Sequence, residues 1–184
     1  METADLDLPL VLDEAQKELE RTAISFVRGN SPMTRVRKLR DTKDETGFSR
    51  ELWAQMAELG WVGMNIPEAY GGMGLGFFEL SIVLEQLGRQ LAPEPFLSTV
   101  LLASQVLLRG GSDAQKQAHL PSVAAGERVL TVAYAEKGSR FALDRIATTL
   151  TREGDHVVLT GEKIQVLDGH VADALIVSAR SSAG

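Results

Sequence analysis

The residues best placed for chemistry lie in Val129–Arg140, where the pattern of the whole chain changes. The stretch opens with VLTVAY, whose apolar, β-branched and aromatic residues predict a buried strand. A polar loop with one glycine, EKGSR at 136–140, follows. A loop at the seam between a helical layer and a sheet is a favoured place for a small-molecule ligand. A domain linker that binds nothing is the alternative interpretation.

Two other segments invite comparison with phosphate-binding sites. The turn Tyr70–Gly74 (YGGMG) is rich in glycine, but it lacks the lysine of a P-loop. A tight chain reversal is the preferred interpretation. Residues 28–43 carry six basic side chains, but acidic residues follow closely. We interpret this run as a solvated connecting segment, because charge runs usually face solvent.

Metal and nucleophile chemistry find little support in the sequence. The histidines, His119, His156 and His170, are far apart and show no ligand spacing. The chain has no cysteine, which excludes disulfides, thiolate metal sites and thiol nucleophiles. No nucleophile elbow is visible. We therefore expect surface histidines and no metal site.

Up to about residue 127, apolar residues recur every three or four positions, as in amphipathic helices. Helices are expected over about 12–29, 49–59, 77–88 and 95–108, with a short helix capped by Ser112 or Asp113 and another that starts at Pro121. The third and fourth helices are apolar around most of their circumference. That pattern predicts burial on several sides, in the centre of a bundle.

Beyond residue 128, short β-branched runs alternate with turns. Strands are expected over about 129–134, 146–151, 156–160, 164–167 and 174–178. Tight turns between them favour antiparallel pairing. The predicted fold class is α+β, with an N-terminal helical bundle over 1–127 and a partial antiparallel β domain over 128–184. So few strands cannot close a barrel, which indicates a truncated chain or one piece of a larger assembly.

Composition narrows the choice of partners. Of 184 residues, 25 are acidic and 19 are basic, and the net charge of −6 argues against nucleic acid and anionic membranes as general partners. No apolar run reaches membrane-spanning length. The acidic first residues are typical of neither a secretion signal nor a transit peptide. A cytoplasmic protein without a membrane span is the natural expectation.

Several motifs, taken in order, resemble the flavin-dependent acyl-CoA dehydrogenase family. Leu59-Gly60-Trp61 followed by PEAYGGMG at 67–74 resembles the helix–turn signature of that family. Later segments of the family are similar to QKQAHLPSVAAGE at 115–127, DHVVLTGEK at 155–163 and AD at 172–173. The ordered set covers nearly the whole chain.

The resemblance implies a fold and an activity. The family has a helical domain, a middle β domain and a C-terminal helical domain, and this chain would cover the first and about half of the second. FAD lies across the seam, and a glutamate from the C-terminal region removes the α-proton of the substrate while a hydride passes to the flavin. The implied function is α,β-dehydrogenation of an acyl-CoA thioester in lipid metabolism, such as fatty-acid or steroid side-chain oxidation. The enzyme would be a homo- or hetero-oligomer with an electron-transfer acceptor.

The same resemblance implies site residues, none of them catalytic. The cofactor-binding positions would be Tyr134, Ala135, Ser139, Arg140, Gln165 and Leu167, with Ser139 and Arg140 near a phosphate of FAD or CoA. The substrate-binding positions, lining an acyl cavity, would be Phe96, Leu97, Thr99 and Val100.

Departures from the family pattern affect the expected flavin site. The Thr-Glu-Pro of the family is AEK at 135–137, and its Trp-x-Thr falls on QVL at 165–167. Loss of two hydroxyls and one aromatic surface, at about 1 kcal/mol each, would weaken flavin binding about a hundredfold. We therefore expect the 184-residue chain alone to hold FAD poorly and to be inactive. The alternative function is a non-catalytic partner subunit of a heteromeric dehydrogenase.

Overall fold

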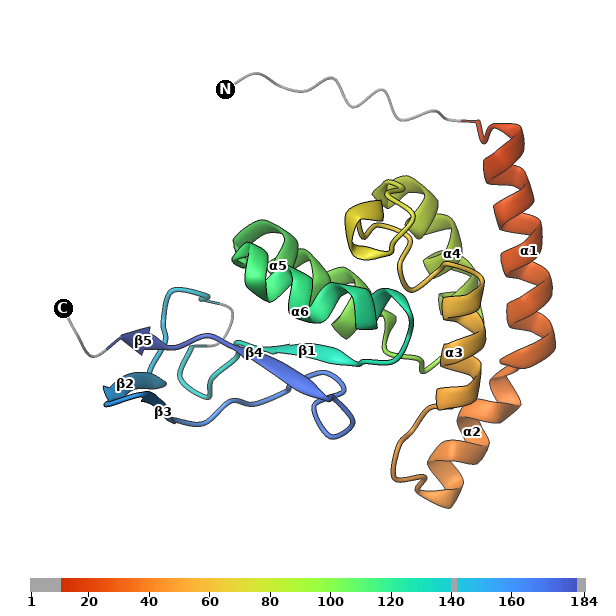
Figure 1. The fold of residues 1–184 in the computed structure, drawn as a ribbon. Helices are drawn as coiled ribbons and strands as arrows, with labels where there is room; N and C mark the ends of the chain where they lie inside the picture. The colour runs from red at the N-terminus through yellow and green to blue at the C-terminus, as the bar shows by residue number, and fades with distance from the viewer. Residues whose placement is uncertain (1–10, 140–141, 182–184) are drawn as a thin grey trace.

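The computed structural model describes residues 11–139 and 142–181. Figure 1 shows a helical part, from which β1 leads into a smaller part made of strands and loops. The predicted fold class, helices first and strands after them, is confirmed. The helical elements are α1 (Glu14–Asn30), α2 (Met33–Thr42), α3 (Arg50–Glu58), η1 (Glu68–Tyr70), α4 (Phe77–Arg89), η2 (Phe96–Ala103), α5 (Ser104–Gly110) and α6 (Asp113–Ala124). The strands are β1 (Leu130–Ala133), β2 (Thr149–Glu153), β3 (His156–Thr160), β4 (Ala174–Val177) and β5 (Arg180–Ser181).

The hydrophobic core lies in the helical part and reaches β1. Its largest fully buried side chains include Trp53 of α3 and Trp61 of the following turn. Trp53 meets Phe96 edge to face with ring centroids 5.2 Å apart, and Trp61 meets Phe26 in the same way at 5.1 Å. α1 packs on α4, and η2 packs on β1. The π-helix η2 is therefore the element of the helical part that packs against the first strand.

Side-chain caps explain where three of the helices begin. Asp13, Ser49 and Ser112 each accept a hydrogen bond from a backbone N–H in the first turn of α1, α3 and α6. The cap predicted at Ser112 is thus confirmed. Among the described residues, no helix is both long enough and apolar enough to cross a bilayer.

Three predictions about the helices were wrong. Residues 33–42 form the helix α2 instead of a solvated connecting segment. Its apolar residues, Met33, Val36 and Leu39, recur every three positions, but none of them is buried. Pro121 lies inside α6 and does not start a new helix. There it removes one backbone donor without ending the helix. Phe77, expected to be buried, is 47% exposed at the start of α4.

The strands form two small sheets with mixed pairing. β1 pairs with β4 in parallel, β2 pairs with β3 antiparallel, and β2 pairs with β5 in parallel. The expected antiparallel pairing thus holds only for the β2–β3 hairpin. The predicted strand over 164–167 is a loop, because Gln165 adopts a left-handed backbone conformation with φ 51°. The division into domains at residue 127 stays a prediction.

Candidate functional site

Two loops lie side by side where β1 ends. The first, residues 134–139, leaves β1, and the second, residues 161–168, leads from β3 towards β4. The Ile164 N–H donates a 2.9 Å hydrogen bond to the Ala135 carbonyl and joins them. Both segments predicted to contact a cofactor are therefore neighbours in space.

A buried carboxylate in the first of these loops, that of Glu136, connects four segments of the chain. Glu136 is only 6% exposed, and its Oε1 accepts a 2.6 Å hydrogen bond from Nζ of Lys163. The Thr148 hydroxyl and backbone N–H also donate to Oε1, at 2.7 and 3.0 Å, and the Ala147 N–H donates to Oε2 at 2.6 Å. Lys163 in turn donates to the Ser178 hydroxyl at 2.9 Å, just after β4. We call these five residues the Glu136 cluster.

The charge of Glu136 is well stabilised by these donors. The Lys163 ammonium, then the Thr148 hydroxyl and the two backbone N–H groups, lower the pKa of the Glu136 carboxyl from 4.5 to about 2. The carboxylate is thus ionised at any physiological pH. Since all its partners are hydrogen-bond donors, the carboxylate holds these segments together and does not act as a base.

Gly161 is required for the Glu136 cluster to assemble. A Cβ on Gly161 would lie only 2.7 Å from both Cα and Cβ of Thr148, closer than real side chains pack. The glycine lets Thr148 approach, and Lys163, two residues later, reaches the same carboxylate. This is the physical reason for a Gly-x-Lys sequence at 161–163.

The second loop is also fixed at its far end. The Thr131 hydroxyl donates to the Leu167 carbonyl at 2.6 Å, and the Ser98 hydroxyl donates to Oδ2 of Asp168 at 2.6 Å. Both Gln165 and Asp168 have positive φ, which costs non-glycine residues energy. Contacts to β1 and η2 therefore hold a strained loop in place.

The predicted cofactor residues fall into two groups. Tyr134 and Leu167 are each 45% exposed, and Gln165 is also exposed. Ala135 is half-buried. Ser139 is buried, and its hydroxyl both accepts from the Glu136 N–H and donates to the Glu136 carbonyl. That hydroxyl is occupied by its own turn, and Arg140 lies outside the described residues.

The predicted substrate residues do not share one surface. Phe96 and Val100 are core residues, and Thr99 is fully buried. The Thr99 hydroxyl donates to the Leu130 carbonyl at 2.9 Å and accepts from the Leu130 N–H at 3.2 Å. Leu97 faces outward and is 52% exposed. Of the four, Leu97 alone has a side chain that a ligand can reach without moving the core.

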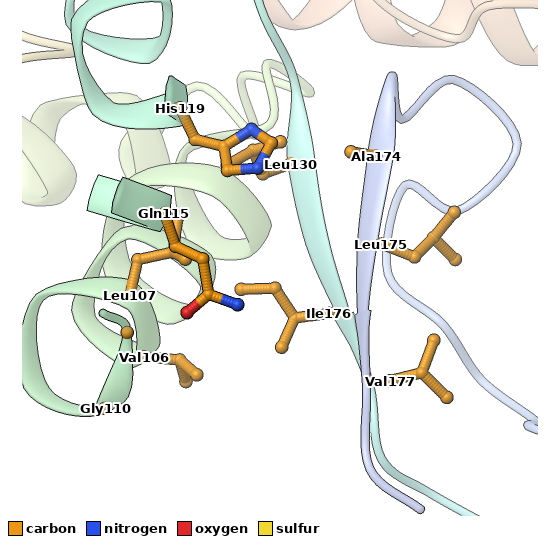
Figure 2. Close-up of a pocket in the computed structure, with 11 residues that line it drawn as sticks. Val106, Leu107, Gly110, Gln115, His119, Leu130, Ala174, Leu175, Ile176 and Val177 are labelled. Carbon is orange, nitrogen blue, oxygen red and sulfur yellow. The ribbon is translucent and has the colours of Figure 1, made fainter. Parts of the chain in front are cut away.

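Sequence reasoning missed an apolar groove between the helices and the β1–β4 pair. The groove has a volume of about 420 Å³ and is lined by α5, α6, β1 and β4. Figure 2 shows Ile176 pointing towards Gln115, whereas Leu175 and Val177 point to the other side of β4. His119, expected on a plain surface, lies at this groove and hydrogen-bonds Arg128 at 3.0 Å. No local motif marks the groove, because its walls come from distant segments.

The backbone N–H groups of the glycine-rich turn are hydrogen-bonded to backbone carbonyls just before it. The N–H groups of Gly72, Met73 and Gly74 donate to the carbonyls of Pro67, Gly63 and Ile66 at 3.2, 3.0 and 2.9 Å. A Cβ on Gly72 would overlap the Ile66 carbonyl. The prediction of a tight chain reversal is confirmed, and these donors are not free for a phosphate.

Comparison with known proteins decides the family. The model of the acyl-CoA dehydrogenase N-terminal domain matches residues 13–127. The chain belongs to the acyl-CoA dehydrogenase family. The resemblance drawn from its motifs is thereby confirmed. Within the described residues, the structure shows no group of three His, Asp or Glu side chains that could hold a metal.

Relatives of this acyl-CoA dehydrogenase family member are considerably longer. Mitochondrial isovaleryl-CoA dehydrogenase from Bos taurus is 31% identical over 92% of this chain, which covers 40% of that protein. The structure of the ChsE4-ChsE5 complex from Mycobacterium tuberculosis matches with 35% identity and a TM-score of 0.80, over 95% of this chain and 46% of that one. An acyl-CoA dehydrogenase from Bacillus anthracis, complexed with FAD, matches with 26% identity and a TM-score of 0.82, over 94% of this chain and 30% of that one. The chain thus spans less than half the length of these relatives.

Proposed function

We propose that this chain is part of an FAD-dependent acyl-CoA dehydrogenase-type enzyme, which oxidises the Cα–Cβ bond of an acyl-CoA thioester. One observation carries the proposal: in a member of this family, the Ile164–Ala135 hydrogen bond joins two loops in which the side chains of Tyr134, Gln165 and Leu167 are exposed. Exposed aromatic and apolar side chains on a strained, well-anchored loop are typical of a ligand site.

The residues on this surface fit a flavin. Tyr134 and Leu167 offer apolar area to a planar ring, and Ala135 and Gln165 belong to the same two loops. Lys163 neutralises the buried carboxylate of Glu136, so the site does not repel an anionic cofactor. When bound, FAD supplies the acceptor for the hydride that leaves the β-carbon of the substrate. The relative from Bacillus anthracis supports the assignment, since its structure contains FAD.

Two surfaces are candidates for binding the acyl chain of the substrate. The first is the exposed side of η2 at Leu97, with Phe96, Thr99 and Val100 shaping it from within the core. The second is the groove that Ile176 lines, whose apolar walls suit a hydrocarbon chain. Leu97→Asp and Ile176→Asp test them separately in the complete enzyme. The variant that raises the KM for acyl-CoA, with the FAD spectrum unchanged, identifies the acyl surface.

Flavin titration tests the cofactor assignment. We expect the 184-residue chain to bind FAD weakly, and Ala135→Thr, Gln165→Trp and Leu167→Thr together to tighten binding about a hundredfold. Val157→Thr, on the exposed strand β3, is the matched control and should leave affinity unchanged. Quenching of flavin fluorescence measures both. Equal affinity in the triple variant and the unaltered chain would remove the flavin assignment from these loops.

A non-catalytic partner subunit is the second candidate. The replaced side chains at 135, 165 and 167 favour it, and so does the similarity to the ChsE4-ChsE5 complex, which contains two different chains. Co-expression with the product of a neighbouring gene, followed by co-purification and an acyl-CoA oxidation assay, separates the two functions. Activity from a homomer of the complete protein would exclude the partner-subunit function.

A further inference from the structure

The Glu136 cluster occupies an unusual place in the fold. Glu136 belongs to the loop after β1, Thr148 comes just before β2, Lys163 belongs to the loop after β3, and Ser178 follows β4. The cluster therefore connects both sheets to both loops of the candidate cofactor site. The segments it joins are distant in sequence, so no local turn can replace it.

We propose that Glu136 and Lys163 are positioning residues, which hold the two loops in the arrangement that the cofactor needs. This inference rests on the proposed function for its purpose, but its geometry is independent of it. Lys163 adjoins Ile164, whose N–H reaches the Ala135 carbonyl, and Ala135 adjoins Glu136. The ion pair and this backbone hydrogen bond thus form one closed ring across the two loops.

The ring leaves the exposed residues free for a ligand. Gln165 follows the ring directly, Leu167 lies two residues further on, and Tyr134 precedes the ring. The pair itself is almost completely buried, with 9% of the Lys163 and 7% of the Glu136 side chain exposed. A buried ion pair whose other hydrogen-bonding groups are also satisfied is rigid, because each group is held by several partners. Removal of one partner would leave an unpaired charge inside the protein. This rigidity sets the spacing of the loops before any ligand binds.

The opposite end of β1 provides a matched control. There Asp173 accepts a 2.8 Å hydrogen bond from the Val129 N–H and lies 3.8 Å from the Arg50 guanidinium. It too is a carboxylate that joins β1 to a distant segment and faces a cation. It differs from Glu136 in lying at the start of the strand, away from both loops, and in its exposure, which is 36% of the side chain against 7%.

Amide hydrogen exchange on the chain without cofactor is the deciding measurement. Glu136→Gln and Lys163→Met should each speed exchange roughly tenfold in segments 134–139 and 161–168, with α4 unchanged, because local opening costs less free energy once the pair is lost. The double variant should do no more than either single one, since the pair acts as a unit. Asp173→Asn should leave both segments unchanged. Unchanged exchange in Glu136→Gln, or additive effects in the double variant, would overturn the inference.

Two further measurements keep the test decisive. If Glu136→Gln does not fold, Thr148→Val removes one donor while the ion pair remains, and it should give a smaller increase in the same two segments. In FAD titration, Glu136→Gln should raise the Kd for FAD about tenfold, which is a loss of about 1.4 kcal/mol of binding free energy. Asp173→Asn should leave this Kd unchanged. Equal Kd in Glu136→Gln and the unaltered chain would overturn the inference. Failure of both the unaltered chain and the Ala135→Thr, Gln165→Trp, Leu167→Thr variant to bind FAD would count against the proposed function, and the exchange result would still decide the positioning role.

Discussion

The helical part and the β3–β2–β5 sheet are held together by different forces. The helical part encloses a cluster of buried apolar side chains that includes both tryptophans. The sheet has almost no buried side chains, and every residue of β3 is exposed. Its connection to the rest of the protein runs through the polar Glu136 cluster. Burial therefore determines the structure of one part, and a few hydrogen bonds and one ion pair determine that of the other.

The largest loss of unfolding free energy should follow from a cavity in the helical part. Trp53→Ala removes a side chain that is 1% exposed and packs on Phe96, and it should cost about 3–5 kcal/mol of unfolding free energy. Val157→Ala in β3 removes a side chain that is 52% exposed and should cost less than about 0.5 kcal/mol. Urea unfolding measures both. Similar costs for the two variants would contradict the contrast between the parts.

A smaller loss of unfolding free energy should follow from overpacking next to the Glu136 cluster. Gly161→Ala forces a Cβ against Thr148 and should cost about 1–3 kcal/mol, as overpacking usually does. Gly138→Ala is the control, because nothing lies within 4 Å of the added Cβ. Thermal unfolding and the exchange rates of segments 134–139 and 161–168 report the outcome. Tolerance of alanine at 161 would mean that Thr148 need not approach so closely.

The smallest change in unfolding free energy should appear when the pH is lowered. The folded pKa of Glu136 is lowered to about 2, so its charge stabilises the fold fully above pH 4.5 and progressively less as the pH falls towards 2. Glu136→Gln lacks this charge. The stability gap between the unaltered chain and Glu136→Gln should therefore be constant near neutral pH and should shrink between about 4.5 and 2. Urea unfolding at a series of pH values measures it, and a gap that closes above pH 5 would disprove the assigned pKa.

The sequence predicted best where burial decides the structure. Apolar periodicity located α1, α3 and α4, and a polar cap located the start of α6. α2 was missed because its few apolar residues, Met33, Val36 and Leu39, lie among basic side chains and none of them is buried. The run 164–167 was misassigned because β-branched and apolar residues suit a strand, whereas contacts from Thr131 and Ser98 hold it as a loop.

The candidate site was predictable only in outline. The motifs pointed to the loops after β1 and β3, and both lie together as the resemblance implied. The fourth helix, chosen for its apolar character, supplied mostly core residues, since an apolar pattern does not distinguish a cavity wall from a packed interior. The groove at Ile176 and the role of Lys163 depend on contacts between distant segments, which no local pattern records.

The parallel pairing of β1 with β4 has a consequence for folding. Val129 and Asp173, which meet at the start of this pair, are 44 residues apart in the chain. At about 5–20 residues per second, a ribosome needs roughly 2–9 s to make the intervening segment, and during that time β1 has an open edge. The β2–β3 hairpin forms within the segment and brings its ends closer, which lowers the entropy cost of closing the long loop. We expect the helical part to fold before β4 docks on β1, so the α5 and α6 side of the groove stays uncovered until then.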